Sequence, residues 1–155
     1  MRVREIYDYL IFSDEKKELV IMFENLIKEV YGSLAGDIKD RYKEEVENWI
    51  YSTYLNLFLA YNDKNEVIGF AVGEYVENSF CVKHYIGLHC YVKPMFRKTR
   101  AAYLLYKAII DRADKYNLPI LVNAFQLNDT KTIMKKLTDR ELFKTHVREA
   151  KNGNV

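Results

Sequence analysis

The stretch VKPMFRKTRAAYLLYKAI, from Val92 to Ile109, decides the fold. It begins as the end of a strand, passes through Pro94, and then becomes apolar at helical spacing. Arg97, Lys98 and Arg100 stand directly ahead of this helix. A helix start already carries positive potential, so each extra cation there costs roughly a few tenths of a kcal/mol. The arrangement therefore predicts an anion opposite this helix end.

Periodicity and turn residues divide the rest of the chain into strands and helices. Ser13 is the expected N-cap of the first helix, and Gly32 is its expected end. Asn62 to Glu66 supply the turn of a hairpin. The expected elements are a strand at 2–12, helices at 13–32 and 37–55, strands at 55–62, 67–78 and 79–92, a helix at 98–117, a strand at 119–126, a short helix at 130–139 and a last strand at 140–150.

The order of these elements predicts the class of fold. A strand, an amphipathic helix and a buried strand in succession form a right-handed crossover, so we expect 87–92 and 119–125 to be adjacent parallel strands. Hairpins precede this unit, so the sheet is mixed and mostly antiparallel. The class is α/β, or α+β in some schemes. Residues 1–150 are expected to form one domain, with 151–155 as a frayed tail.

The composition limits the kinds of partner and cofactor that the sequence predicts. Hydrophobic residues make up 49% of the 155 residues and charged residues 30%, which is typical of a globular domain. A net charge of +2 argues against nucleic acid as partner, and no run approaches the about 18 apolar residues of a membrane span. Cys81 and Cys90 form neither a disulfide framework nor a metal-ligand pattern. We expect a cytoplasmic protein without a metal; a homodimer is compatible with the sequence.

The segment V-K-P-M-F-R-K-T-R-A-A-Y-L-L resembles the central motif of the GNAT superfamily of acyl-CoA-dependent N-acyltransferases, V-x-P-x-x-[RQ]-x-x-G-x-[GA] followed by a Leu-rich helix. The order of elements resembles this family over essentially the whole chain, and implies helices on both faces of the sheet. The matching positions are Val92, Pro94, Arg97, Ala102 and Leu105, with Asn128 matching an Asn that often opens the family's last helix.

The resemblance implies an N-acyltransferase, and in particular an N-acetyltransferase, that moves an acetyl group from acetyl-CoA to an amine of a small molecule or a protein. Backbone amides at a helix start form an anion site, which suits the phosphates of coenzyme A. By resemblance the pantetheine arm would pair with the strand before the motif. The expected donor-site residues are Cys90, Tyr91, Val92, Arg97, Lys98, Thr99, Arg100, Ala101, Ala102 and Asn128.

Several positions depart from the family pattern. Arg100 replaces the first glycine of the motif, and the Ala and Tyr that usually follow the late Asn are Lys131 and Lys135. No tyrosine follows Tyr116, although the chain has 13, so the family's usual proton donor to the leaving thiolate is missing. These departures favour an alternative: a catalytically degraded GNAT-fold protein with a binding or regulatory role, of viral or mobile-element origin.

Three side chains are candidates for the base that activates the amine. His84 and His89 lie on the strand leading into the motif, and Glu74 lies on the preceding strand. Strand alternation places the two histidines on opposite faces unless a bulge intervenes, with His84 on the face of Cys90 and Val92. Each candidate also reads as an ordinary, partly exposed strand residue, and Cys90 reads as a small buried filler.

Overall fold

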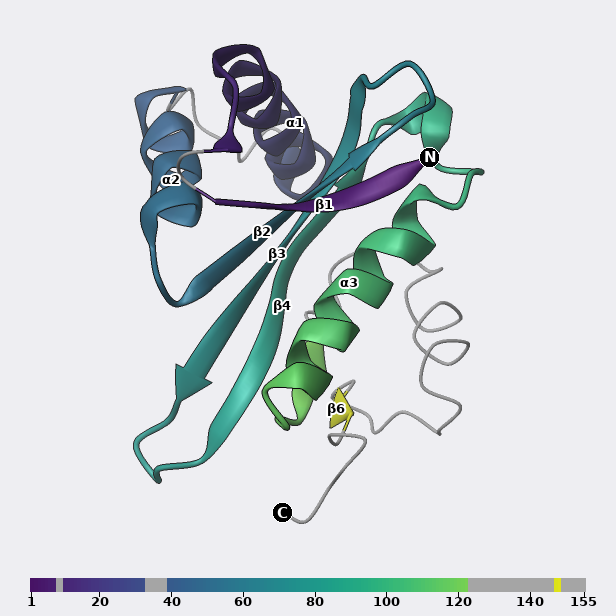
Figure 1. Cartoon of the computed structure of the whole chain (residues 1–155). Coiled ribbons are helices and arrows are strands. Elements are labelled where there is room, and N and C mark those ends of the chain that lie inside the picture. Colours follow the sequence, from purple (N-terminus) through teal and green to yellow (C-terminus); the bar gives the residue numbers. More distant parts are fainter. Residues whose placement is uncertain (8–9, 33–38, 123–146, 149–155) are drawn as a thin grey trace.

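A mixed β-sheet runs through the centre of the structure (Figure 1). The computed structural model describes residues 1–7, 10–32, 39–122 and 147–148. Within them the strands pair in chain order, each with its neighbour in sequence. The strands are β1 (Arg2–Ile6), β2 (Leu55–Tyr61), β3 (Val67–Glu77), β4 (Lys83–Val92), β5 (Ile120–Val122) and β6 (Val147–Arg148).

The pairing directions confirm the predicted crossover. Strands β1 to β4 are antiparallel, whereas β4 and β5 are parallel, with Tyr85 opposite Ile120 and Gly87 opposite Val122. The helix between them is α3 (Ala101–Lys115). The described pairing lies at 85–87, earlier along β4 than the expected 87–92. Strand β6 then adds antiparallel to β5, so the sheet is mixed and mostly antiparallel as predicted.

Helices cover both faces of this sheet. Figure 1 shows α1 (Ser13–Tyr31) and α2 (Lys39–Tyr51) on one side and α3 on the other. Alternation along each strand sends successive side chains into two separate cores. The α1/α2 core contains Leu19, Met22, Phe23, Leu26, Val46, Trp49, Leu57, Leu59, Phe70 and Val72. The α3 core contains Phe58, Ala60, Ile68, Ala71, Tyr85, Cys90, Leu105, Ile109 and Ile110.

The ends of several elements differ from the expectation: α2 ends at Tyr51, β4 begins at Lys83 and α3 begins at Ala101. Two further differences, at β1 and α1, have a visible cause. Strand β1 stops at Ile6, because the chain turns and the Leu10 N–H donates to Tyr7 O at 2.8 Å. Ser13 is the first residue of α1 rather than its N-cap, since the extended residue Phe12 takes that position. The Glu15 carboxylate accepts the Phe12 N–H at 3.0 Å and satisfies the helix start instead.

The predicted end of α1 is confirmed. Gly32 adopts a φ of 57° and donates its N–H to Lys28 O. The other predictions at the C-terminal end, namely the helix at 130–139, Asn128 and the tail at 151–155, lie outside the described residues, as does all but 147–148 of the strand predicted at 140–150.

Candidate functional site

The turn between β4 and α3 is closed by its own backbone. The 3-10 helix η3 (Pro94–Phe96) follows β4, and Phe96 N donates to Lys93 O at 2.8 Å. The Thr99 hydroxyl donates to Phe96 O at 2.6 Å and accepts the Ala101 N–H at 3.3 Å. The Thr99 hydroxyl, one residue before the N-cap Arg100, therefore accepts the first N–H of α3. Pro94 starts the turn where its missing N–H is not needed.

The first turn of α3 presents donors without protein acceptors. The Leu104 N–H is the first to close a helical turn, onto Arg100 O at 3.0 Å. Among the described residues, the N–H groups of Ala102 and Tyr103 have no acceptor. Lys98 and Arg100 are exposed and form no ion pair with the described part of the chain. Free amides at a helix start and two unpaired cations suit a phosphate group.

Arg100 does not strain the backbone of this turn. It is the N-cap residue of α3, with φ −75° and ψ 0°. The family's glycine is therefore not needed here for a positive φ, and a side chain is tolerated at this position. Its guanidinium adds a charge beside the free amides.

Arg97 has a different set of partners. Its Nε donates to Val92 O at 2.9 Å, and its Nη2 donates to both carboxylate oxygens of Glu29 at 2.6 and 2.7 Å. The guanidinium also lies 5.5 Å from the centre of the Tyr91 ring. The structure thus separates Arg97 from Lys98 and Arg100, which the sequence had grouped with it.

Strand β4 presents the three expected donor-strand residues to different surroundings. Cys90 is buried opposite Ala71 in the α3 core, and burial raises the pKa of its thiol to about 12, so the thiol is not a nucleophile at neutral pH. Tyr91 lies in the α1/α2 core, where burial raises the pKa of its phenol. Val92 ends the strand and gives its carbonyl to Arg97.

A β-bulge at Leu88 changes which side chains share a face. His89 is opposite Val72 and Gly87 is opposite Gly73, so β4 carries one residue more than β3 at this point. The two histidines were predicted to point to opposite faces unless a bulge intervened, and the bulge places them on the same face. His84 is opposite Val76 and His89 opposite Val72, two positions of equal parity, while Cys90 and Val92 face α3.

Glu74 lies between these two histidines on the α1/α2 face. It is opposite Ile86 on β4 and is two residues along β3 from each of Val72 and Val76. A two-residue step along a strand is about 7 Å, so Glu74 is a diagonal cross-strand neighbour of each histidine. The fold thus places the three candidate bases in one row on the α1/α2 face of the sheet.

The two histidines differ in environment. The His89 ring packs 5.4 Å from the ring centres of both Phe23 and Trp49, and burial lowers the pKa of His89 to about 4. Its imidazole is neutral at pH 7. His84 stands near the open end of β4, with Nδ1 3.3 Å from Val82 O. The position of His84 leaves it open to solvent on one side, whereas His89 is part of the aromatic core.

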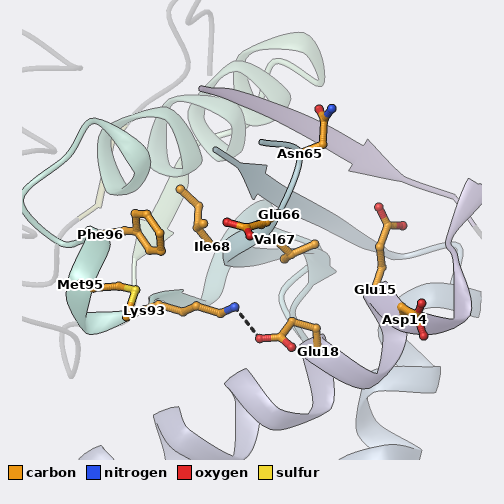
Figure 2. Close-up of a pocket in the computed structure, with 10 residues that line it drawn as sticks. All are labelled: Asp14, Glu15, Glu18, Asn65, Glu66, Val67, Ile68, Lys93, Met95 and Phe96. Atoms are coloured by element: carbon orange, nitrogen blue, oxygen red, sulfur yellow. Dashed lines mark ion pairs between the residues drawn. The ribbon is translucent and has the colours of Figure 1, made fainter. Parts of the chain in front are cut away.

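A cavity of about 520 Å³ lies beside the β4–α3 turn, on the side of the α1 start (Figure 2). Figure 2 shows the ion pair between two of its lining residues, Lys93 and Glu18. Carboxylates outnumber cations in its lining, so the cavity repels phosphate. Its lining residues are Asp14, Glu15, Glu18, Asn65, Glu66, Val67, Ile68, Lys93, Met95 and Phe96. In the described part of the chain, no three His, Cys, Asp or Glu side chains gather as a metal centre would require.

Sequence reasoning missed Glu29, and it named a bulge only as a possibility, without a position. Glu29 lies in the last turn of α1, where the helix dipole disfavours a carboxylate. This unfavourable position was the available signal that Glu29 has a cationic partner. The bulge left no such signal, because the apolar pattern of β4 reads the same in either register. Asn128, expected at the donor site, lies outside the described residues.

Comparisons with known proteins agree with this arrangement. The profile described as the acetyltransferase (GNAT) family matches residues 20–133, so the chain belongs to the GNAT acetyltransferase family. A search of curated proteins found no match. In the described residues, no helix is long and apolar enough to cross a membrane.

Solved structures share the fold at low sequence identity. An acetyltransferase from Vibrio fischeri is 19% identical with a TM-score of 0.58, covering 79% of this chain and 94% of its own. A mutant protein from Bacillus halodurans is 12% identical with a TM-score of 0.72, covering 93% and 95%. An aminoglycoside 6'-N-acetyltransferase from Acinetobacter haemolyticus is 17% identical with a TM-score of 0.64, covering 93% and 94%.

Proposed function

We propose that this chain is an N-acetyltransferase that uses acetyl-CoA and acetylates an amine by direct attack. Family membership implies the acetyl-CoA donor. The observation that carries the proposal is the α3 start, where the free N–H groups of Ala102 and Tyr103 stand beside the unpaired Lys98 and Arg100. These four residues would hold the phosphates of coenzyme A. They fit that group because the turn offers donors and positive charge together.

Strand β4 supports the placement of the thioester. Its described pairing with β5 covers 85–87, and the bulge at Leu88 follows at once. An extended pantetheine arm can add to a strand edge through backbone hydrogen bonds, as a peptide does in β-augmentation. The acetyl group would then lie near Leu88, within reach of the row formed by Glu74 and the two histidines.

Acetyl transfer needs a base that deprotonates the amine, attack by the amine nitrogen on the thioester, and departure of the thiolate. The amine nitrogen forms a bond to the thioester carbonyl carbon, the carbon–sulfur bond breaks, and the departing sulfur takes up a proton. Glu74 is the best-placed base of the three candidates, since it lies centrally in the row and its carboxylate is half-buried. His89 serves poorly as a base for an ammonium group, because burial holds its pKa near 4. No tyrosine follows Tyr116, so we expect water to protonate the thiolate and turnover to be slow.

The acceptor lies on the α1/α2 side in this proposal. Tyr51 ends α2 and is 61% exposed, and Tyr54 lies in the turn after it and is 64% exposed. The Tyr54 carbonyl accepts the Tyr75 N–H beside Glu74. These rings form a rim to which a small amine can bind. The named activity of the Acinetobacter protein makes aminoglycosides a reasonable first class of acceptor to test.

The test is a coupled assay. Purified protein is incubated with acetyl-CoA and panels of aminoglycosides, polyamines and peptide α-amines, with free thiol and acetylated product both measured. We expect thiol release that depends on the amine, with a matching gain of one acetyl group in its mass. Binding of CoA without any transfer would favour the alternative of a GNAT-fold binding protein. No binding at millimolar CoA would refute the proposal.

A further inference from the structure

Arg97 links the end of β4 and the β4–α3 turn to α1, a helix far away in the sequence. Its side chain leaves the β4–α3 turn, donates to Val92 O at the end of β4, and reaches Glu29 on α1 with two bonds of 2.6 and 2.7 Å. It also packs over the Tyr91 ring. About a third of the Arg97 side chain is exposed, so the pair is partly shielded from solvent. The turn that precedes α3 is thereby tied to the helix on the opposite face of the sheet.

The Arg97–Glu29 pair removes two electrostatic penalties at once. Glu29 alone would oppose the dipole at the end of α1, and Arg97 alone would add to the positive potential ahead of α3. Paired, they are neutral, so they contribute little net attraction to an anion. Lys98 and Arg100 keep their charge, because neither forms an ion pair with the described residues.

The hydrogen bond from Arg97 Nε to Val92 O lets the Arg97–Glu29 pair restrain the β4–α3 turn. The carbonyl of Val92 and the backbone of the turn are fixed from both ends: Lys93 N donates to Ile68 O at 2.9 Å, and Arg97 N donates to Pro94 O at 3.3 Å. The Arg97 side chain closes this turn back onto β4. This turn leads into α3, where Thr99 holds the helix start, so the closure by Arg97 adds to the contacts that orient the N–H groups of Ala102 and Tyr103.

We propose that Glu29 is a positioning residue for the acyl-CoA phosphates. It acts through Arg97, which holds the turn in place, while Lys98, Arg100 and the α3 amides contact the phosphates. This inference rests on the proposed function, and it assigns to Arg97 a role in shaping the site rather than in binding the anion.

The direction in which Glu29→Ala changes the affinity for acetyl-CoA distinguishes a positioning role of Glu29 from a purely electrostatic one. Glu29→Ala frees the positive charge of Arg97, which by electrostatics alone would tighten the binding of an anion. If Glu29 positions the turn, the same variant binds acetyl-CoA more weakly, by about 3- to 10-fold, as expected for residues that couple through one network. Glu29→Gln keeps an acceptor oxygen for Arg97 and should retain most of the affinity. Binding is measured by calorimetry with acetyl-CoA.

A double variant tests whether the effect passes through Arg97. Glu29→Ala with Arg97→Ala leaves the local charge unchanged, whereas Arg97→Ala alone leaves Glu29 unpaired and negative. If Glu29 acts only through Arg97, the double variant should bind acetyl-CoA no more weakly than Arg97→Ala alone and keep the wild-type dependence on ionic strength. Glu24→Ala is the matched control. Glu24 lies on the same helix and pairs with Lys28 at 2.7 Å, so the control adds the same charge without touching the turn. We expect no loss of affinity in this control.

Equal or tighter binding by Glu29→Ala would overturn the inference and make Arg97 a phosphate ligand restrained by Glu29. A reduced dependence on ionic strength in the double variant would do the same. These outcomes leave the proposed function intact, since all of them require that CoA binds. Absence of CoA binding by the unchanged protein would remove the function and this inference together.

Discussion

The phenol of Tyr85 lies across Gly73 and its hydroxyl donates to Asn56 Oδ1 at 2.8 Å. Asn56 in turn donates to Glu5, which pairs with Arg112 on α3. A side chain from β4 therefore crosses β3 to reach β2, and it can do so only because residue 73 has no Cβ. This partly buried polar chain links β1, β2, β4 and α3 at the point where β5 joins the sheet.

Gly73→Ala should lower the free energy of unfolding by about 2–3 kcal/mol, because the added methyl group would overlap the Tyr85 ring. Gly32→Ala is the control for glycine substitution in general. It has open space around the added Cβ but a φ of 57°, and should cost about 1 kcal/mol through backbone conformation alone. Chemical denaturation measures both. If Gly73→Ala lowers the free energy of unfolding no more than the control does, the Tyr85 ring does not pack closely against residue 73.

Glu15→Ala should be among the more destabilising changes of a charged residue. Its carboxylate accepts from Arg4 at 3.0 and 3.1 Å, from the buried Tyr61 hydroxyl at 2.7 Å and from the Phe12 N–H at 3.0 Å. Removing it takes an acceptor from the Tyr61 hydroxyl, the Phe12 N–H and Arg4, although Arg4 still donates to the Tyr61 oxygen at 2.8 Å, so we expect a loss of about 2–4 kcal/mol.

The matched control for Glu15→Ala is Asp14→Ala, whose carboxylate is exposed and lies 3.9 Å from Lys17. That change should cost under about 1 kcal/mol. Tyr61 reports the same network by absorbance: burial first, and then its bond to Glu15, raise the pKa of Tyr61 to about 12. We expect Glu15→Ala to lower this pKa, and an unchanged titration would mean that burial alone sets it.

His89 predicts how stability depends on pH. Its pKa is about 4 in the folded protein and about 6.5 when unfolded, so the unfolded state binds the proton more readily. The stability that neutral His89 contributes is present above pH 6.5 and is lost as the pH falls from 6.5 toward 4. The loss is on the order of 2–3 kcal/mol.

Comparison with His89→Gln isolates this contribution, because carboxylates also titrate at low pH. The difference in unfolding free energy between the two proteins should move against the histidine protein by that amount between pH 7 and pH 4. A constant difference over this range would show that His89 remains accessible to protons in the folded state.

Arg100→Gly tests the helix start directly. The φ of −75° gives glycine no conformational advantage, so the variant should bind CoA more weakly, by about 10- to 100-fold, through loss of a charge-assisted contact. Calorimetry with CoA and with its analogue lacking the ribose phosphate assigns the contact to one phosphate group. Tighter binding by the variant would show that the arginine side chain obstructs the approach of the ligand.

Glu74→Gln should reduce kcat more than His84→Ala or His89→Ala if Glu74 is the base. Glu74 has the central place in the row, and Gln keeps its shape without its ability to take a proton. His89→Ala should instead lower stability, because its ring fills space between Phe23 and Trp49. Greatest loss at His84 with a normal Glu74→Gln enzyme would transfer the role to the histidine.

Over the described residues, the sequence by itself determined the order of the elements, the parallel crossover and the family motif. Helical spacing in α3 and alternation in the hairpin are local properties, set by the neighbours of each residue in the chain, so they can be read without coordinates. Gly32 could be recognised as a helix end for the same reason.

Only the tertiary structure decided which of the expected site residues work together. The bulge at Leu88 depends on how β4 meets β3, and it reversed the relation of His84 to His89. Arg97 looked equivalent to Lys98 and Arg100 until Glu29, 68 positions away, was placed beside it. Register and long-range ion pairs arise from packing between distant segments, and no local pattern of residues encodes them.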